Sequence, residues 1–312
     1  MFRKEVIMFK KILFATTASP ACDAAAKIAF ELAEKYESEL ILFHVFGVPS
    51  HGSSFTITDY VTGEQDESGP NYIDFVKEEM KTTYEAQIQK HGEPAIEVLA
   101  GIPSTEILRY ARSRDVDCII MGAHTREDET ASTRFRGIVG TTMQKVAQRA
   151  RCPVLIISRP CDTCFWYFNK IIFGTDFSKA SMAAFKFAFK MAEGIGCKLY
   201  LFHALDIGTS QAGISPGQQS IENQIRQARE RIKTEYVSQM NRFDNYEIVI
   251  WEGDTPYVEL LKFVRESSGD LIVMAHHTRE IEPEKALLGS TVEQVVLRSA
   301  CPVASVNRPD KL

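Results

Sequence analysis

The sequence predicts a doubly wound α/β protein built from two copies of one domain in tandem. Short apolar runs recur along the chain between turn residues, as is typical of parallel strands covered on both faces. Segments with helical apolar periodicity lie between these runs. The runs keep the same order and similar spacing in both halves of the chain, which indicates a duplication.

The duplication rests on five pairs of matching segments. They are residues 11–17 with 170–176, 40–44 with 199–203, 117–122 with 270–275, 124–126 with 277–279, and 150–156 with 299–305. We therefore expect two domains, at residues 9–158 and 169–308, with residues 158–169 joining them. A long polar connection follows the second strand of each copy, near residues 47–70 and 206–218.

Apolar stripes predict three matching helices in each copy. The stripes are Ala25, Ile28, Ala29 and Leu32 with Ala184, Phe187, Ala188 and Met191; Ile107, Leu108 and Ala111 with Leu260, Leu261 and Val264; and Met143, Val146 and Ala147 with Val292, Val295 and Val296. The predicted helix N-caps are Ser19, Ser104, Ser178 and Asp254.

Five strands that alternate with four helices predict an open parallel sheet in each copy, with helices on both faces and right-handed crossovers. The expected strand order is 3-2-1-4-5.

The composition limits the function. The formal net charge of −5 argues against a general nucleic-acid binder, which needs a basic footprint. No apolar run approaches the roughly 20 residues of a membrane-spanning helix, and the first residues are too charged for a secretory signal. The seven cysteines lie mostly in strand-like or helix-like segments, which favours reduced, buried thiols. We therefore expect a cytoplasmic protein without membrane or nucleic-acid partners.

The matched segments resemble the universal stress protein family in its tandem form, from about Lys11 to Asn307. The most specific ones are Ile-Leu-Phe-Ala-Thr at residues 12–16, Asp-Cys-Ile-Ile-Met-Gly at 117–122 and Cys-Pro-Val-Leu-Ile-Ile at 152–157. The resemblance implies a flavodoxin-like (Rossmann-like) fold and pairing through the last strand. We therefore expect the last strands of the two copies, residues 154–157 and 303–306, to pair antiparallel in one continuous sheet, which would also cover two open strand edges. The resemblance also implies an ATP or AMP site at the carboxyl ends of strands one and four in the family's nucleotide-binding branch.

General physical reasoning places a ligand at the same edge. Ligands of open parallel sheets bind where the strand order reverses, here between strands one and four. The free N–H groups of the following helix favour phosphate. The family motif there is Gly-x-x-Gly, a spacer, and then Gly-Ser/Thr, with an Asp after strand one that contacts the adenosine.

Both copies depart from this motif. In the first, Thr125 replaces the second glycine, Thr17 replaces the Asp, and the spacer is longer than the family's. Its candidate residues are Thr16, Gly122, Thr125, Arg126, Gly140, Thr141 and Thr142. In the second, Ala275 and Thr278 replace the first two glycines, but the Asp is kept. Its candidate residues are Thr175, Asp176, Ala275, Thr278, Gly289, Ser290 and Thr291.

The loops after strand four differ in charge. Arg126, Arg134 and Arg136 in the first copy favour phosphate binding there, although acidic residues 127–129 dilute them. The loop at residues 280–285 is largely acidic. The opposite interpretation, that both sites are relics and both final glycines only begin helices, stays open.

Other reactive residues have plain structural interpretations. Cys161 and Cys164 form a Cys-x-x-Cys pair without the second pair that a structural zinc site needs, so we expect incidental linker thiols. His124, His276 and His277 lie in the loops after strand four and do not predict a metal site. His44 and His203 end the second strands, where a ring N–H bonded to backbone across the sheet is expected.

These observations predict a stress-response sensor or signalling module that binds ATP or AMP, needs no metal and has no catalytic residues. No Gly-x-Gly-x-x-Gly follows the first strand, which argues against a dinucleotide-binding dehydrogenase. The copies are expected to form an internal pseudo-dimer. A further homodimer and an unnamed protein partner stay open. The alternative is a nucleotide-free interaction module that docks a protein or an apolar ligand through the loops after strand two.

Overall fold

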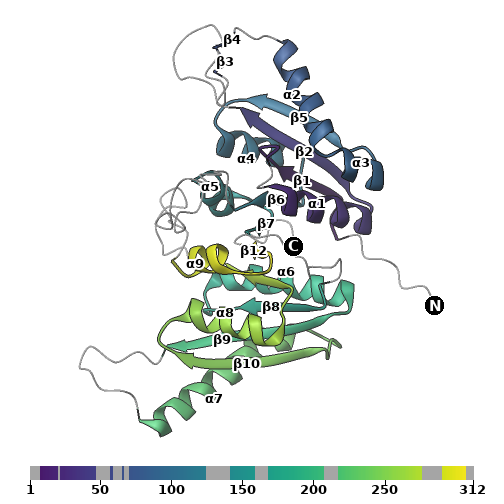
Figure 1. The fold of residues 1–312 in the computed structure, drawn as a ribbon. Coiled ribbons are helices and arrows are strands. Elements are labelled where there is room, and N and C mark those ends of the chain that lie inside the picture. The colour runs from purple at the N-terminus through teal and green to yellow at the C-terminus, as the bar shows by residue number, and fades with distance from the viewer. Residues whose placement is uncertain are drawn as a thin grey trace, which may run out of the picture.

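The computed structural model describes residues 8–19, 22–46, 57–58, 65–66, 70–123, 141–158, 168–206, 217–275 and 290–306. Both halves of the chain form α/β units, which Figure 1 shows one above the other. The first unit contains β1 (Lys11–Ala15), α1 (Asp23–Tyr36), β2 (Glu39–Phe46), β3 (Ile57–Thr58), β4 (Gln65–Asp66), α2 (Pro70–Thr83), α3 (Glu85–His91), β5 (Ala95–Ala100), α4 (Pro103–Ser113), β6 (Cys118–Gly122), α5 (Thr141–Arg149) and β7 (Val154–Ile157). The second unit contains β8 (Lys170–Gly174), α6 (Lys179–Ile195), β9 (Lys198–Asp206), α7 (Gln218–Glu235), β10 (Tyr246–Gly253), α8 (Pro256–Ser267), β11 (Leu271–Met274), α9 (Ser290–Arg298) and β12 (Val303–Ser305).

One sheet runs through both units. Its ten strands follow the order β10-β9-β8-β11-β12-β7-β6-β1-β2-β5. Counted within each unit, the order is 3-2-1-4-5, and the neighbouring strands inside a unit are parallel. The predicted doubly wound fold and its strand order are confirmed.

The two units join through β7 and β12, which lie at the centre of the sheet and pair antiparallel (Figure 1). Leu155 faces Ala304 in this register, and these two residues are equivalent in the repeat. An approximate twofold axis therefore passes between them. Gln144 and Glu293, also repeat equivalents, meet nearby through a 3.2 Å hydrogen bond from Nε2 to Oε1. The predicted antiparallel pairing is confirmed.

Helices cover both faces of the sheet, as predicted. One face carries α1, α2, α6 and α7 over one large apolar cluster. The other face carries α4, α5, α8 and α9 over a second cluster. Successive strand residues point to opposite faces, so Ile12 and Phe14 join the first cluster while Leu13 and Ala15 join the second. Burial on both faces explains why the strand segments are nearly all apolar.

The predicted apolar stripes lie in these clusters, with only Ile28, Leu108 and Leu261 partly buried. The predicted N-cap Ser178 is confirmed, because its side chain accepts the backbone N–H of Ser181. The other three predicted caps are wrong: the helices follow Cys22 instead of Ser19, Ile102 instead of Ser104, and Thr255 instead of Asp254. Pro103 and Pro256 begin two of these helices, because proline's fixed φ and missing N–H suit the first turn.

Each unit fixes the start of its first strand with one carboxylate. Asp117 Oδ2 accepts the backbone N–H groups of residues 10 and 11 at 2.9 and 3.0 Å. Asp270 Oδ2 accepts those of residues 169 and 170 at 2.9 Å. The same contact in both units ties the amino end of strand one to the start of strand four.

Candidate functional site

A buried threonine follows the first strand of each unit, at the carboxyl edge of the sheet. Thr16 bonds through its hydroxyl to the hydroxyl of Tyr84, and Thr175 to that of Tyr236, with 2.7 Å between Oγ1 and Oη in the second unit. Each threonine Oγ1 also accepts the backbone N–H of the residue two positions further on, at 2.9 Å. The hydroxyl therefore links the loop after strand one to the helix after the long connection.

The helix that carries the tyrosine is interrupted there in both units. α2 ends one residue before Tyr84 and α3 begins one residue after it. α7 ends one residue before Tyr236, and a 3₁₀ turn at Val237–Gln239 follows. Both tyrosines belong to the largest fully buried side chains among the described residues. Each helix thus leaves its regular path where the tyrosine reaches strand one.

The backbone that leaves strand one is left-handed in both units. Ala18 has a φ of 53° and Phe177 a φ of 60°, a region that side chains other than glycine seldom adopt. These are the residues whose N–H groups bond to the threonine hydroxyls. The threonine–tyrosine pair therefore holds the turn from strand one into the following helix.

A histidine from strand two completes this arrangement. Nδ1 of His44 donates to the carbonyl of Thr16 at 2.9 Å, and Nδ1 of His203 donates to that of Thr175 at 2.8 Å. A carbonyl only accepts, so Nδ1 carries the proton in both rings. The predicted structural role of these histidines is confirmed. Burial lowers the pKa of both, and the carbonyl contact partly opposes it.

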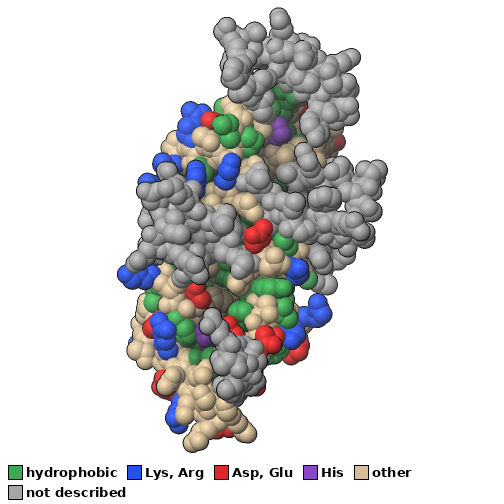
Figure 2. Space-filling model, turned by 90° about the vertical axis from the view of Figure 1, so that its left-hand side faces the viewer, with side chains coloured by type: hydrophobic (Ala, Val, Ile, Leu, Met, Phe, Trp, Pro, Cys, Tyr) green, Lys and Arg blue, Asp and Glu red, His purple; other side chains and the backbone are tan. Residues whose placement is uncertain are grey.

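Strand four brings part of the predicted site next to the threonines. Met121 pairs with Ala15, so Gly122 lies beside Thr16 at the same edge. In the second unit Ala275 follows β11 beside Thr175 in the same way. α5 and α9 begin at Thr141 and Ser290, and Thr142 and Thr291 are half-buried. Figure 2 views this edge of the molecule, where described side chains of both charges are interspersed.

Five predicted site residues lie outside the described residues: Thr125, Arg126, Gly140, Thr278 and Gly289. Arg134, Arg136, Cys161, Cys164, His124, His276 and His277 lie outside them as well. The structure therefore brings together the strand-one and strand-four parts of each site and the first turns of α5 and α9.

The two units differ in the residue that follows the threonine. Asp176 Oδ1 accepts the backbone N–H of Ser178 at 2.9 Å and the hydroxyl of Ser181 at 2.6 Å. Both donors belong to the start of α6, so the carboxylate is oriented by the helix beneath it. In the first unit Thr17 shares a 2.9 Å hydroxyl contact with Ser19 instead.

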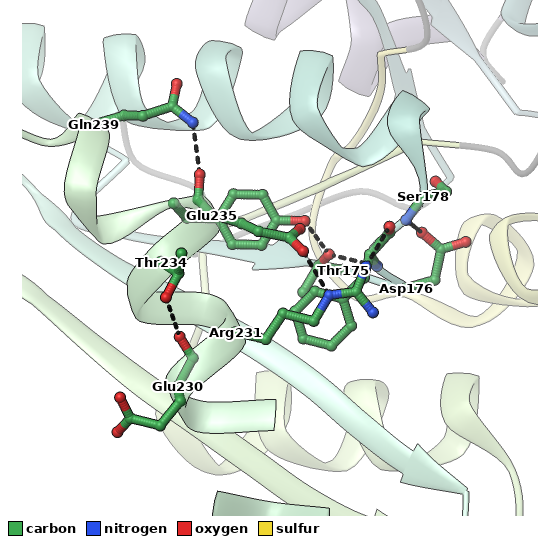
Figure 3. A network of polar contacts seen from close by, with 10 residues as sticks. Thr175, Asp176, Ser178, Glu230, Arg231, Thr234, Glu235 and Gln239 are labelled. Carbon is green, nitrogen blue, oxygen red and sulfur yellow. Dashed lines mark hydrogen bonds and ion pairs between the residues drawn. The ribbon is translucent and has the colours of Figure 1, made fainter. Parts of the chain in front are cut away.

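A cation lies over this turn in the second unit (Figure 3). The guanidinium of Arg231 lies 4.3 Å from the centre of the Phe177 ring and donates to the carbonyl of Phe177 at 3.3 Å. Its Nε also bonds to Glu235 at 2.5 Å. The side chain of Arg231 is 51% exposed, so this cation reaches the solvent at the mouth of the site.

The corresponding position of the first unit carries the opposite charge. Glu79 precedes Tyr84 by the same number of residues as Arg231 precedes Tyr236. Burial has the largest effect on both histidines and lowers their pKa. Glu79 acts to raise the pKa of His44; in the second unit Asp176 acts to raise the pKa of His203, and Arg231 acts to lower it. The two sites share one scaffold but differ in charge at the rim.

Comparison with known proteins settles the family. The model of the universal stress protein family matches residues 8–158 and again residues 168–307. The chain belongs to the universal stress protein family. Universal stress protein MJ0531 of Methanocaldococcus jannaschii is 28% identical over 160 residues, 49% of this chain and 84% of the relative. YxiE of Bacillus subtilis, another universal stress protein, is 27% identical over 158 residues, 48% of this chain and 99% of the relative. Each of these relatives thus spans about one half of the chain.

Solved structures of similar architecture cover both units. A universal stress protein from Archaeoglobus fulgidus superposes with a TM-score of 0.61 over 97% of both chains at 21% identity. Protein PA1789 from Pseudomonas aeruginosa gives a TM-score of 0.60 over 98% of this chain and 95% of that one, at 18% identity. At these identities the likeness shows the fold, here the continuous arrangement of two universal stress protein units.

The described part of this universal stress protein contains no group of three or more His, Cys, Asp or Glu residues placed to hold a metal ion. Its five described cysteines are buried thiols that form no disulfide with one another: Cys22, Cys118, Cys152, Cys197 and Cys301. Within the same residues, no helix combines the length and the apolar character needed to span a membrane.

Sequence reasoning missed four residues of this site: Tyr84, Tyr236, Arg231 and Glu79. The tyrosines are 68 and 61 residues from the threonines they contact, beyond any local pattern. One signal was present, because each tyrosine follows an apolar residue by four positions, Met80 in one copy and Ile232 in the other. Aligning that helix between the copies would have paired the tyrosines and exposed the charge difference five residues earlier.

Proposed function

We propose that this universal stress protein binds an adenine nucleotide, ATP or AMP, and serves as a cytoplasmic sensor or signalling module in the stress response, without catalytic residues of its own. We place the nucleotide in the second unit, at the carboxyl ends of β8 and β11. The observation that carries the proposal is the orientation of Asp176, whose Oδ1 is held by Ser178 and Ser181 at the reversal point of the strand order.

The chemistry of this edge suits the two ends of a nucleotide. An ionised carboxylate only accepts hydrogen bonds, and the ribose hydroxyls and the adenine amino group donate them. α9 begins at the same edge, where the unpaired N–H groups of a first turn favour phosphate. Arg231, which is paired with Glu235, lies half-exposed at the rim and can offer guanidinium donors to a phosphate.

Among its described residues the first unit lacks two of these features, the carboxylate after strand one and the cation at the rim. Thr17 stands where the second unit has Asp176, and Glu79 stands where it has Arg231. The arginines of the loop at residues 124–140 are the counter-argument for this unit, so the experiment treats both units alike.

A nucleotide titration of the purified chain tests the proposal. Millimolar ATP or AMP should raise the thermal midpoint, because a ligand at 100 times its Kd stabilises the folded state by about 2.7 kcal/mol. Asp176→Asn keeps an oxygen that can accept from Ser178 and Ser181 but removes the charge, and should weaken binding about tenfold. Thr17→Ala is the matched control in the first unit and should leave the affinity unchanged.

Three results would change the proposal. If Thr17→Ala weakens binding and Asp176→Asn does not, the nucleotide occupies the first unit. If guanine nucleotides stabilise the chain as strongly as adenine nucleotides, the site does not recognise the base. If no nucleotide shifts the thermal midpoint, the favoured function is the alternative, a nucleotide-free interaction module that docks a ligand through the loops after strand two.

The proposed arrangement is an internal pseudo-dimer of two domains, residues 9–158 and 169–308. The approximate twofold axis between Leu155 and Ala304 supports it, because equivalent strands and helices meet there. Association of two chains into a homodimer is a separate proposal. Sedimentation analysis with and without ATP would test it.

A further inference from the structure

A polar pocket lies at the amino edge of the sheet, the edge opposite to the one where the nucleotide site is proposed. This pocket of about 210 Å³ opens in the first unit where α4 and α5 end. Arg112, Arg149 and Arg151 line it together with Asp115, and the buried Cys152 contributes to its wall. The three arginines and one aspartate among the lining residues carry a formal net charge of +2, in a chain whose net charge is −5.

Helix termini account for two of these arginines. Arg112 and Arg149 lie in the last turns of α4 and α5, where cations stabilise the carbonyl end of a helix. The second unit has Arg265 and Arg298 in the last turns of α8 and α9. These arginines recur as part of the fold, so by themselves they do not indicate a ligand.

Arg151 is different. It follows α5 instead of belonging to it, and its repeat equivalent in the second unit is Ala300. The arginines in the last turns of α4 and α5 already place a cation at the carbonyl end of each helix, so the helix ends do not account for Arg151. The first unit thus adds a guanidinium to a pair that the fold already supplies, and it does so at the wall of a pocket.

The surroundings of the shared arginines differ as well. In the second unit the guanidinium of Arg298 lies 5.4 Å from the centre of the Tyr257 ring. Ser104 stands where Tyr257 stands in the repeat, so the ring that Arg298 contacts has no counterpart in α4. In the first unit the α5 arginine instead lines the pocket beside Arg112 and Arg151.

We propose that this pocket binds a phosphate group, as free phosphate or as a small phosphomonoester. Guanidinium groups present paired N–H donors that match the oxygens of phosphate, and several can bind one anion. The net charge of +2 matches a phosphate dianion. The volume equals roughly seven water molecules. That suits a small anion, since pockets for drug-sized ligands span about 300–1,000 Å³.

The test uses the full chain, with inorganic phosphate as the probe and sodium chloride at matched ionic strength as the salt control. Calorimetric titration and thermal midpoints should show saturable binding of phosphate that chloride does not reproduce. Arg151→Ala copies the residue of the second unit at an exposed position and should weaken phosphate binding about tenfold. Arg151→Lys keeps the charge but loses the paired donors, and should restore binding only in part.

Arg265→Ala in the second unit is the matched control and should leave phosphate binding unchanged. Phosphoserine, as a small phosphomonoester, then separates the two sources of the phosphate group: tighter binding than inorganic phosphate assigns an esterified ligand, and weaker binding assigns the free anion. The proposal is overturned if Arg151→Ala binds phosphate as wild type does. It is also overturned if Asp176→Asn abolishes the phosphate signal, which would place the anion at the nucleotide site.

Discussion

The buried tyrosine hydroxyls give the sharpest test of the interactions that hold the proposed nucleotide site in shape. Tyr84→Phe removes one oxygen, which lies against Thr16 at the end of strand one. The phenylalanine ring fills the same space, so no cavity forms. The buried Thr16 hydroxyl keeps the N–H of Ala18 as a donor but loses its other partner.

Leaving a buried polar group without its partner costs about 1–3 kcal/mol. We expect Tyr84→Phe to lower the free energy of unfolding by that amount, because Thr16 Oγ1 is bonded once instead of twice. For a unit of about 150 residues, 1 kcal/mol corresponds to roughly 2–4 °C in the midpoint. Tyr236→Phe should cost a similar amount in the second unit, since Thr175 has the same contacts.

Tyr36→Phe is the matched control, with the opposite expected sign. Tyr36 Oη is buried but has no hydrogen-bond partner among the described residues. Burial raises the pKa of this tyrosine to about 12. Its ring meets Phe9 edge-on at 5.5 Å, a contact that phenylalanine retains. Removing an unpaired buried hydroxyl should leave stability unchanged or raise it by up to about 1 kcal/mol.

Urea unfolding followed by circular dichroism measures all three variants against the wild type. The slope of the free energy with urea should stay constant, which shows that the unfolded reference is the same. The reasoning is refuted if Tyr84→Phe costs no more than Tyr36→Phe. It is also refuted for the nucleotide site if Tyr236→Phe loses stability but binds ATP with wild-type affinity, because the turn at Phe177 would then not depend on the tyrosine.

Two further predictions concern pH and the join between the units. Burial raises the pKa of Glu31 from 4.5 to about 7, although the charges of Lys27 and Lys90 act to lower it. The protonated Glu31 therefore contributes its full stability below about pH 4.5, and this contribution is lost as the pH rises through 7. Glu31→Gln should therefore be more stable than the wild type at pH 8, by on the order of 1–3 kcal/mol, and should show no such gain at pH 4.5 in urea titrations. Ile156→Asp places a charge on β7 opposite Val303 in a fully buried position and should destabilise the chain by more than about 3 kcal/mol. Small-angle scattering should then show the units separated, whereas Ile156→Val should keep the wild-type profile.

The fold could be predicted from the sequence because its determinants are local or repeated. Apolar runs such as residues 118–122 become buried strands, and the stripe with Ala25 and Ala29 faces the sheet. The pairing of β7 with β12 was expected from the resemblance to the universal stress protein family, and covering the open edge of each last strand is consistent with it. Because the domain is duplicated, each strand and helix pattern occurs twice in the sequence, and the second copy supports the prediction made from the first.

The missing parts of the site depend on contacts between distant segments. Tyr84 lies at a helix position whose apolar surroundings indicate plain core, and only the fold brings its hydroxyl to Thr16. The charge of Arg231 acts through a turn that forms far away in the sequence, at Phe177. Periodicity reports which side of a helix is buried, but it does not report which polar atom meets which.

Comparing the two units shows which contacts stabilise the shared fold and which ones differ between the copies. The threonine–tyrosine bond, the histidine on the threonine carbonyl and the aspartate at the start of strand one occur in both units. Each of these satisfies a buried or backbone polar group, so its loss is costly in either unit.

The differences lie at the exposed rim, where Asp176 and Arg231 replace Thr17 and Glu79. In a dimer of identical chains one substitution would change both sites. In this chain each site is encoded separately, so a substitution changes one site only, and an exposed charge contributes little to stability. Asp176→Asn should therefore weaken nucleotide binding, while Thr17→Ala leaves it unchanged.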